Sequence, residues 1–352
     1  MAMYEVAVVG VGAVGEEMLR VLSEHRFPAK NVRVLARSDR SIEVDGREYQ
    51  VQATTPDAFD GVDVALFAGT EGEKGAAVTY GEEAVRRGAV VIDNGADFRM
   101  RPDVPLVVPE VNGETLRSHK GIVANPNCST AQLVMALKPL HDYGKLTRVL
   151  ISTYQAVSGA GGSGPVELAS QTKAIASGQP IPPASTFATQ IVQNVIPQIG
   201  GFDDRGYTSE EMKLVNETRK ILGDSSIAIT PMITARVPVV LGHSEAVYVE
   251  TEKPISPDKA RELWASFPGI KVVDDIHSGD PAAAWPTPLM AAGNDLTYIG
   301  RVRADISRPG GLVFWVVSDN LRKGAASNAV QIAEKMVELD LLRKERKRPG
   351  HA

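Results

Sequence analysis

The chain has 352 residues, of which 43% are hydrophobic and 23% charged, and its formal net charge is −5. This composition is typical of a globular protein of about two domains and excludes disordered, collagen-like and coiled-coil chains, while the acidic excess argues against nucleic acid as a partner. The single cysteine permits no intrachain disulfide, and no segment resembles a signal peptide or a membrane span. We therefore expect a cytoplasmic protein with no membrane partner.

The first third of the chain alternates strand-like and helix-like segments. Tyr4–Val9 is a short apolar strand, a glycine-rich turn follows it, and residues 16–23 have helical spacing. A helix is also predicted at residues 75–87, and further strands at residues 31–35, 62–67, 90–92, 106–108 and 121–123. Such alternation predicts an α/β fold, an N-terminal Rossmann-type domain with a doubly wound parallel sheet.

The pattern changes after a helix that begins near Cys128 and carries leucines at positions 133, 137 and 140. A glycine-rich loop is predicted at residues 158–165, and strands at residues 149–157, 227–229, 246–250, 297–304 and 312–317. Strands without regular intervening helices predict a second, α+β domain with a mixed sheet. A last helix, near residues 321–339, is expected to pack back on the first domain.

The glycine-rich turn is Gly10-Val11-Gly12-Ala13-Val14-Gly15. Glycines let backbone N–H groups approach a pyrophosphate, and the helix dipole favours the anion, so these six residues are candidates for binding a dinucleotide. Arg37 and Ser38 follow the second strand and suit the 2′-phosphate of NADP, whereas an NAD site prefers an acidic residue there. Asp39 is acidic and lies one residue further on, so NADP is favoured with NAD as the alternative.

Cys128 stands at a predicted helix start, where the dipole lowers the pKa of a thiol and makes the thiolate available as a nucleophile. The alternative is a small buried hydrophobic residue, the ordinary role of a free cysteine. A thiolate needs a proton carrier, and histidine titrates near neutral pH. Among six histidines, His243 is the best-placed candidate because it follows Gly242 at the start of a strand.

Several separated segments together resemble the bacterial aspartate-semialdehyde dehydrogenases. The most specific are Val108–Asn112, Asn125–Thr130, Thr153–Gly161 and Arg236–Val239, and the resemblance extends to Asp319–Ala326. It covers nearly the whole chain. The resemblance implies that L-aspartyl 4-phosphate is reduced by NADPH to L-aspartate 4-semialdehyde, with release of phosphate, in the biosynthesis of lysine, threonine and methionine.

The resemblance also implies roles for the matching residues. Cys128 would form a thioester with the substrate, Gln155 would orient the substrate, and His243 would act as the general acid–base. Arg236 would bind the substrate α-carboxylate and Glu210 its amino group. Asn127 would also bind the substrate, and Arg99 and Lys213 would bind phosphate. The residues implied on the nicotinamide side of the cofactor are Ser158, Gly159 and Asn320.

The implied domain organisation is an NADP-binding domain at residues 1–127 plus about 320–345, a catalytic and dimerisation domain at 128–319, and a tail at 346–352. The implied partners are the small-molecule substrate, inorganic phosphate and a second copy of the chain, in some members as a tetramer, with no metal. Two alternatives are open. N-acetyl-glutamyl-phosphate reductases share the chemistry, but their cysteine motif is closer to Pro-Gly-Cys-Tyr-Pro-Thr; a non-catalytic relative is expected to lose Cys128 or His243.

Overall fold

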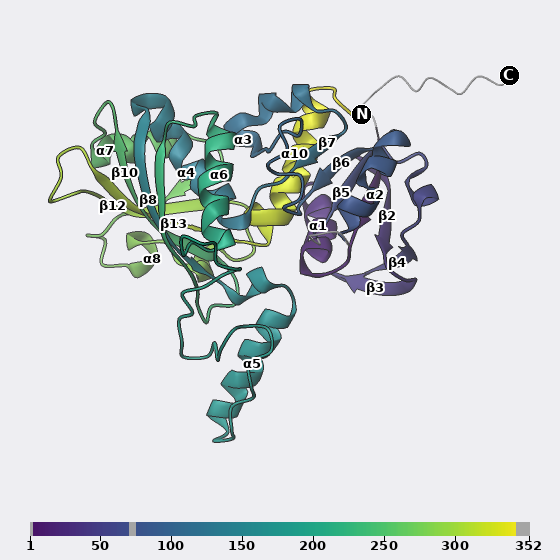
Figure 1. The fold of residues 1–352 in the computed structure, drawn as a ribbon, viewed down its shortest axis with the longest axis horizontal. Helices are drawn as coiled ribbons and strands as arrows, with labels where there is room; N and C mark the ends of the chain where they lie inside the picture. Colours follow the sequence, from purple (N-terminus) through teal and green to yellow (C-terminus); the bar gives the residue numbers. More distant parts are fainter. Residues whose placement is uncertain (1–2, 70–74, 343–352) are drawn as a thin grey trace. The chain divides into compact units, whose positions relative to one another are not determined.

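The structure is a computed structural model that describes residues 3–69 and 75–342. By its internal contacts the described chain divides into two compact units, unit 1 (Met1–Pro126 and Ala325–Ala352) and unit 2 (Asn127–Gly324) (Figure 1). The chain therefore leaves unit 1 once and returns to it near its end. The expected tail at 346–352 lies outside the described residues.

Unit 1 contains, within its described residues, a seven-stranded sheet in the order β3-β4-β2-β1-β5-β6-β7. The strands are β1 (Tyr4–Val9), β2 (Ala29–Ala36), β3 (Arg40–Val44), β4 (Arg47–Ala53), β5 (Val64–Phe67), β6 (Val90–Asp93) and β7 (Ile122–Ala124). All neighbours are parallel except β3 and β4. The predicted parallel, doubly wound fold is confirmed.

The β3–β4 hairpin is absent from the sequence-based prediction. It turns at Asp45 and Gly46, whose φ angles are +51° and +76°. Asp-Gly is a preferred turn for such hairpins because both positions require positive φ, so a sequence signal for it was present. The predicted strand at 106–108 reduces to one isolated bridge, between Leu106 and Ala124.

The helices of unit 1 enclose an apolar core. They are α1 (Ala13–Glu24), α2 (Ala76–Arg86), α3 (Pro109–Asn112) and α10 (Ser327–Glu338), with 3₁₀ turns η1 (Pro56–Phe59) and η2 (Gly113–Ser118). Valines and leucines of β1 and β5 share one buried cluster with apolar residues of α1 and α10. The last helix therefore packs with the N-terminal strands, as predicted.

Unit 2 contains, among the residues described, a six-stranded sheet in the order β11-β12-β13-β10-β8-β9. The strands are β8 (Leu146–Gln155), β9 (Ala228–Arg236), β10 (His243–Thr251), β11 (Ile270–Val272), β12 (Thr297–Ala304) and β13 (Leu312–Ser318). β8 and β9 are parallel, as are β11 and β12, and the other pairs are antiparallel. The predicted mixed sheet is confirmed.

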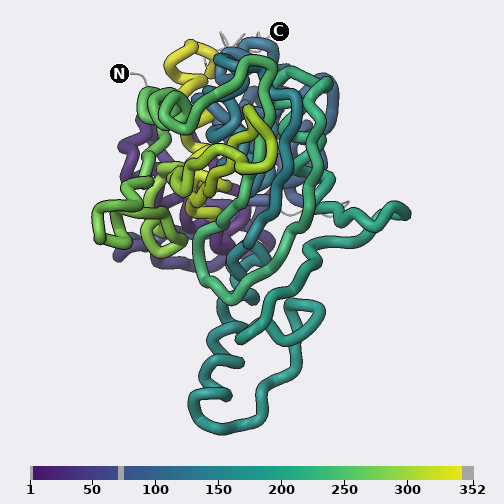
Figure 2. Tube along the Cα trace, turned by 90° about the vertical axis from the view of Figure 1, so that its left-hand side faces the viewer, coloured from purple at the N-terminus to yellow at the C-terminus, as the bar shows by residue number. Residues whose placement is uncertain are grey.

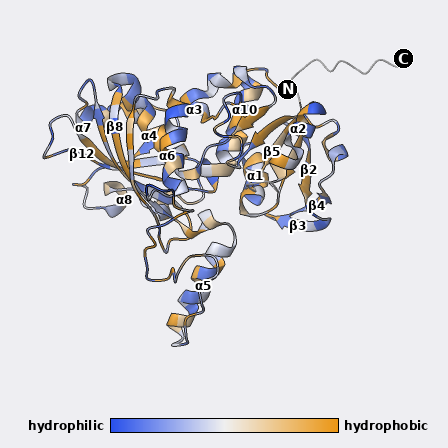
Figure 3. Cartoon of the chain, viewed as in Figure 1, coloured by the Kyte–Doolittle hydropathy of each residue, from blue (hydrophilic) through white to orange (hydrophobic). Residues whose placement is uncertain are grey.

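Unit 2 has six α-helices among the residues described. They are α4 (Cys128–Gly144), α5 (Ser163–Ala176), α6 (Ser209–Leu222), α7 (Pro257–Ala265), α8 (Pro281–Ala284) and α9 (Pro288–Ala291), with a 3₁₀ turn η3 (Val157–Ala160); a π-helical turn, η4 (Arg322–Ala326), spans the return to unit 1. Apolar residues of α4, α6 and α7 share a buried cluster with the strands. Figure 3 shows the hydrophobic colour concentrated in the strands of each sheet.

None of the helices α5 to α9 was predicted from the sequence, and two of them show why. α5 begins inside the predicted glycine-rich loop, and in Figures 1 and 2 it projects with the chain after it away from the sheet. α6 begins at a capping box in which Thr208 and Glu211 bond each other's backbone, a signal readable in the sequence. No helix in the described part of the chain is long and apolar enough to cross a membrane.

Candidate active site

Cys128 is the first residue of α4 and is partly exposed. Asn127 caps this helix: its side-chain oxygen accepts from the backbone N–H groups of Ser129 (3.0 Å) and Thr130 (3.3 Å). Gly324 packs directly against the cysteine, since a Cβ at that position would lie 2.8 Å from the Cβ of Cys128. The helix start thus presents the thiol at the positive end of the helix dipole, where the thiolate is stabilised.

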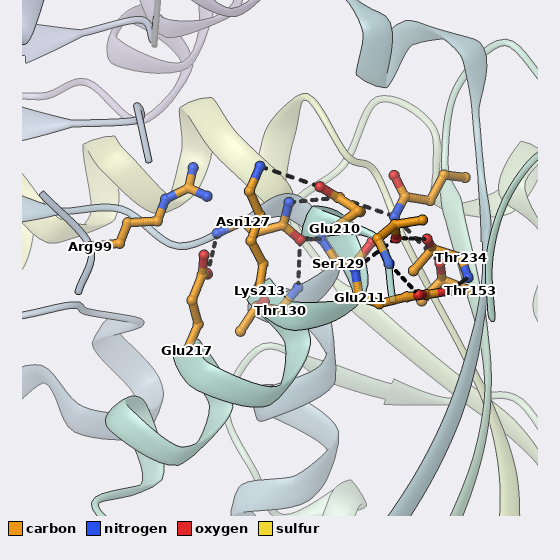
Figure 4. Close-up of polar contacts among 12 residues, drawn as sticks. Arg99, Asn127, Ser129, Thr130, Thr153, Glu210, Glu211, Lys213, Glu217 and Thr234 are labelled. Carbon is orange, nitrogen blue, oxygen red and sulfur yellow. Dashed lines mark hydrogen bonds and ion pairs between the residues drawn. The ribbon is translucent and has the colours of Figure 1, made fainter. Parts of the chain in front are cut away.

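Glu210 on α6 collects three donors (Figure 4). Its Oε1 accepts from Asn127 Nδ2 (2.8 Å) and Gln155 Nε2 (3.2 Å), and its Oε2 pairs with Lys213 Nζ (3.3 Å). Burial raises the pKa of Glu210, but the Lys213 charge and these hydrogen bonds outweigh burial and hold that pKa below its ordinary value. Glu210 is therefore an ionised group that orients both amides.

The Ala156 peptide links two of the expected site residues. Its N–H donates to His243 Nδ1 (3.0 Å), and its carbonyl accepts from Arg236 Nη1 (2.7 Å). A backbone N–H can only donate, so Nδ1 of His243 is the acceptor and the neutral ring carries its proton on Nε2. Burial, with the Arg236 charge beside it, places the pKa of His243 well below its ordinary value, so the ring is neutral at neutral pH.

Gly159 leaves room for both side chains. A Cβ at this position would lie 2.8 Å from Arg236 Nη1 and 3.1 Å from His243 Nε2. Nε2 is buried and has no hydrogen-bond partner among the described residues. Burial lowers the pKa of Arg236, while the charges of Cys128 and Glu210 act to raise it. A guanidinium, a neutral imidazole proton donor and a thiol therefore belong to one polar site within unit 2.

Asn320 joins the start of β10 to the loop after β8. Its amide exchanges hydrogen bonds with Ser158 Oγ (2.9 and 3.2 Å), and its side-chain oxygen accepts from the Gly242 N–H (2.9 Å). Ser158, Gly159 and Asn320, expected on the nicotinamide side of the cofactor, therefore lie next to His243.

The glycine-rich turn of unit 1 fits a pyrophosphate. Gly10 has a φ of +98°, and Gly12 caps α1 without a side chain. A Cβ at Gly15 would lie 1.8 Å from the Gly10 carbonyl oxygen, so only glycine permits this approach of helix to turn. Because glycines have no side chain, none of the three covers the backbone N–H groups at the start of α1, which are the groups that would bind a pyrophosphate.

The residues expected to discriminate NADP from NAD follow β2 directly. Arg37 and Ser38 are exposed there. Asp39, the competing acidic residue, accepts the backbone N–H of Ala53 through its Oδ1 (2.6 Å) and so serves the β4 backbone. The arrangement fits NADP better than NAD.

Arg99, also in unit 1, is buried, and its guanidinium is anchored by backbone carbonyls. Nε donates to the oxygen of Asn125 (2.9 Å), and Nη2 donates to that of Asn94 (2.7 Å). The structure thus brings together the expected residues of unit 2 around Cys128 and His243, and it places Arg99, Arg37 and Ser38 in unit 1. Sequence reasoning missed two parts of the site, the Ala156 peptide and Gly324. A peptide group carries no side-chain signal, and the role of Gly324 is to let the backbone pack closely against Cys128.

Two family models match the chain, one within unit 1 and one within unit 2. Residues 5–119 match the family model of the semialdehyde dehydrogenase NAD binding domain, and residues 137–323 match that of the semialdehyde dehydrogenase dimerisation domain. An aspartate-semialdehyde dehydrogenase from Aquifex aeolicus is 47% identical over 348 residues, 96% of this chain and 99% of the relative. One from Bacillus subtilis is 44% identical over 353 residues, covering 96% and 98%.

Solved structures agree with these sequence relatives. The crystal structure of aspartate semialdehyde dehydrogenase II from Vibrio cholerae, complexed with ASA, matches with a TM-score of 0.89 at 44% identity and covers 96% of this chain and 99% of that one. The resemblance seen in the sequence motifs is therefore confirmed, and the N-acetyl-glutamyl-phosphate reductase and non-catalytic alternatives are not favoured.

Proposed function

The chain belongs to the aspartate-semialdehyde dehydrogenase family of NADP-dependent oxidoreductases, and we propose that it reduces L-aspartyl 4-phosphate to L-aspartate 4-semialdehyde with release of phosphate. One observation carries the proposal. The Ala156 peptide holds His243 and Arg236 together, beside a thiol at the start of α4 whose charge acts on that arginine. The arrangement supplies a nucleophile, a proton donor and a cation in one place.

The first step is acyl transfer to Cys128. Its thiolate attacks the acyl carbon of the substrate, a carbon–sulfur bond forms, and the carbon–oxygen bond to phosphate breaks. Arg236 binds the α-carboxylate, Glu210 binds the amino group, and Asn127 and Gln155, oriented by Glu210, hold the substrate over the thiol. By the family resemblance, Lys213 of unit 2 and Arg99 of unit 1 are each assigned to phosphate.

The second step reduces the thioester. Bound NADPH supplies the hydride. The Nε2–H of the neutral His243 ring donates a hydrogen bond to the oxygen on which negative charge develops. When the carbonyl re-forms, the carbon–sulfur bond breaks and Cys128 leaves as thiolate, so no proton is lost from the ring. Gly159 leaves space at Nε2 for that oxygen, because a larger residue would contact both His243 and Arg236.

The cofactor site is assigned to unit 1. The expected NADP-binding domain, residues 1–127 and about 320–345, differs from unit 1 in that residues 127 and 320–324 belong to unit 2, as does the expected catalytic and dimerisation domain, residues 128–319. The exposed Arg37 and Ser38 after β2 and the glycine-rich turn support this assignment. A cytoplasmic location is proposed because a thiolate nucleophile requires a reducing compartment.

A homodimer is proposed through the face of the unit 2 sheet opposite α4. Tyr154 and Trp315 point to that face, since both flank Ser244 and Ala246 of β10 in register, and their rings lie 5.6 Å apart. Tyr154 remains 36% exposed, an aromatic surface suited to burial in an interface. Sedimentation equilibrium tests this: we expect a dimer that Tyr154→Lys weakens, and an unchanged mass would place the interface elsewhere.

The chemistry is tested by alkylation, because Cys128 is the only cysteine and iodoacetamide can label no other thiol. Activity is followed as phosphate-dependent NADP reduction with aspartate semialdehyde. We expect activity to fall in proportion to labelling, bound substrate or phosphate to slow the labelling, and Cys128→Ser to be inactive. Full activity in a stoichiometrically alkylated sample would refute the covalent mechanism.

A further inference from the structure

Glu245 is a fully buried acid for which the proposed reaction has no use. It follows His243 by two residues on β10, so both side chains point to the same face of the sheet. In register it lies opposite Thr153 of β8 and Val316 of β13. The hydroxyl oxygen of Thr153 accepts from Gln155 Nε2 (3.3 Å). Glu245 therefore occupies the row of side chains next to the one that carries His243.

Gln132 is the matching polar residue on α4. It stands one turn after Cys128, hence on the same side of the helix, and it is 1% exposed. Neither its amide nitrogen nor its amide oxygen has a hydrogen-bond partner among the described residues, and neither do the two carboxyl oxygens of Glu245. Buried polar atoms are nearly always hydrogen-bonded in proteins, so these four atoms require an explanation.

The four atoms complement one another in only one protonation state. An ionised carboxylate offers acceptors alone, so it could bond the amide N–H but would repel the amide oxygen. A neutral carboxylic acid has one O–H donor and one carbonyl acceptor, which match the amide oxygen and N–H. Gln132 lies near enough to Glu245 to act on its pKa in the lowering direction, but burial dominates and places the pKa of Glu245 well above its ordinary value.

Within residues 3–69 and 75–342, no charged group acts against the neutral form. The side chains that face Glu245 are Thr153 from β8, Val316 from β13 and Gln132 from α4, and none of them is ionisable at neutral pH. His243 on the same strand is neutral, because burial lowers its pKa.

We propose that the Glu245 carboxylic acid and the Gln132 amide form a reciprocal pair of hydrogen bonds that ties α4 to β10. The pair joins the helix that begins at Cys128 to the strand that begins at His243. Glu245 and Gln132 are thus positioning residues that keep the thiol in register with the imidazole. This consequence for catalysis rests on the proposed function, whereas the pairing itself does not.

The pairing is tested without any activity measurement, by denaturant unfolding of the native chain and Glu245→Gln from about pH 5.5 to about pH 7.5. A glutamine at 245 can also bond Gln132 reciprocally but cannot ionise. The folded native chain holds a proton that the unfolded chain releases above the ordinary carboxyl pKa, so its stability falls as pH rises. We expect its unfolding equilibrium constant to rise about tenfold per pH unit relative to that of Glu245→Gln.

Glu167→Gln is the matched control. Glu167 is also a buried acid, but its Oε2 accepts the backbone N–H groups of Ser185 (2.9 Å) and Thr186 (2.6 Å). Burial raises the pKa of Glu167, yet these bonds outweigh it and hold that pKa below its ordinary value. The unfolding equilibrium constant of Glu167→Gln, divided by that of the native chain, should stay constant over this pH range. A constant ratio for Glu245→Gln as well would overturn the proposal, because Glu245 would then be ionised.

The positioning role is tested by the rate at which iodoacetamide alkylates Cys128 as a function of pH. We expect Glu245→Gln to keep the native profile, and Glu245→Met and Gln132→Met to shift it and to lower kcat by about tenfold or more with little change in KM. Native profiles in both Met variants would overturn the positioning role. If the native protein is inactive but its unfolding equilibrium constant still rises about tenfold per pH unit relative to that of Glu245→Gln, the proposed function is refuted and the hydrogen-bonded pair stands.

Discussion

Replacing Glu210 by glutamine tests whether this carboxylate organises the site. The substitution keeps the shape of the side chain and removes one acceptor and the negative charge. If the new amide oxygen faces Asn127 and Gln155, its NH₂ group faces the Lys213 ammonium, donor against donor. The reversed amide places NH₂ against two donors instead, so the first orientation is the less unfavourable one.

The magnitude follows from the three contacts. The hydrogen bonds from Asn127 (2.8 Å) and Gln155 (3.2 Å) lose their charge assistance, which removes about 1 kcal/mol each. The Lys213 contact (3.3 Å) belongs to a side chain that is 25% exposed, so it adds at most about 1 kcal/mol. We expect a loss of about 2–3 kcal/mol in the free energy of unfolding at neutral pH.

This loss depends on pH in a stated direction. The pKa of Glu210 lies below its ordinary value in the folded chain, so the stabilisation is present above the ordinary carboxyl pKa and disappears as pH falls through the lowered one. The native chain and Glu210→Gln should therefore converge in stability in acid. Because both oriented amides hold the substrate, kcat/KM should also fall by roughly 10–100-fold.

The assays are denaturant unfolding and steady-state NADP reduction with aspartate semialdehyde. Glu262→Gln is the control, since Glu262 pairs with Lys259 at the same spacing on α7 (2.7 Å) but is 69% exposed, and it should cost less than about 0.5 kcal/mol. If Glu210→Gln costs no more than this control and keeps kcat/KM within about threefold, Glu210 neither orders the amides nor binds substrate.

Three further substitutions test individual roles. His243→Ala should lower kcat by roughly 10²–10⁴ with the fold intact, and retention of more than about a third of native turnover would assign the proton to another group. Arg236→Lys keeps the charge but loses the planar fork, so kcat/KM should fall roughly 10–150-fold with little change in Tm; a change within threefold would remove it from the site. Arg37→Ala should weaken NADP binding by about 1.5–3 kcal/mol and leave NAD binding nearly unchanged; titration showing equal losses would contradict recognition of the 2′-phosphate.

Sequence reasoning was most successful where structure is set by neighbours along the chain. The strand, turn and helix at the N-terminus were predictable because alternation and glycine spacing are local. The start of α4 was predicted from the capping types Ser129 and Thr130, although the residue that caps the helix is Asn127. The helices α5 and α6 were not recovered, although the capping box of Thr208 and Glu211 was readable. The glycine-rich composition around these helices favours loops, and it outweighed the helix signals when the sequence was interpreted.

The sequence alone determined the family and the two-domain α/β organisation, since each depends on short segments with their residues in fixed order, and it predicted Cys128 as the nucleophile. Only the tertiary structure decided how those residues act together. Asn127 meets Glu210 across 83 positions, Gln155 meets it across 55, and the Ala156 N–H that sets the His243 tautomer comes from 87 positions away. Hydrogen bonds and burial depend on distance in space, and no pattern along the chain encodes which buried acid, Glu210 or Glu245, keeps its charge.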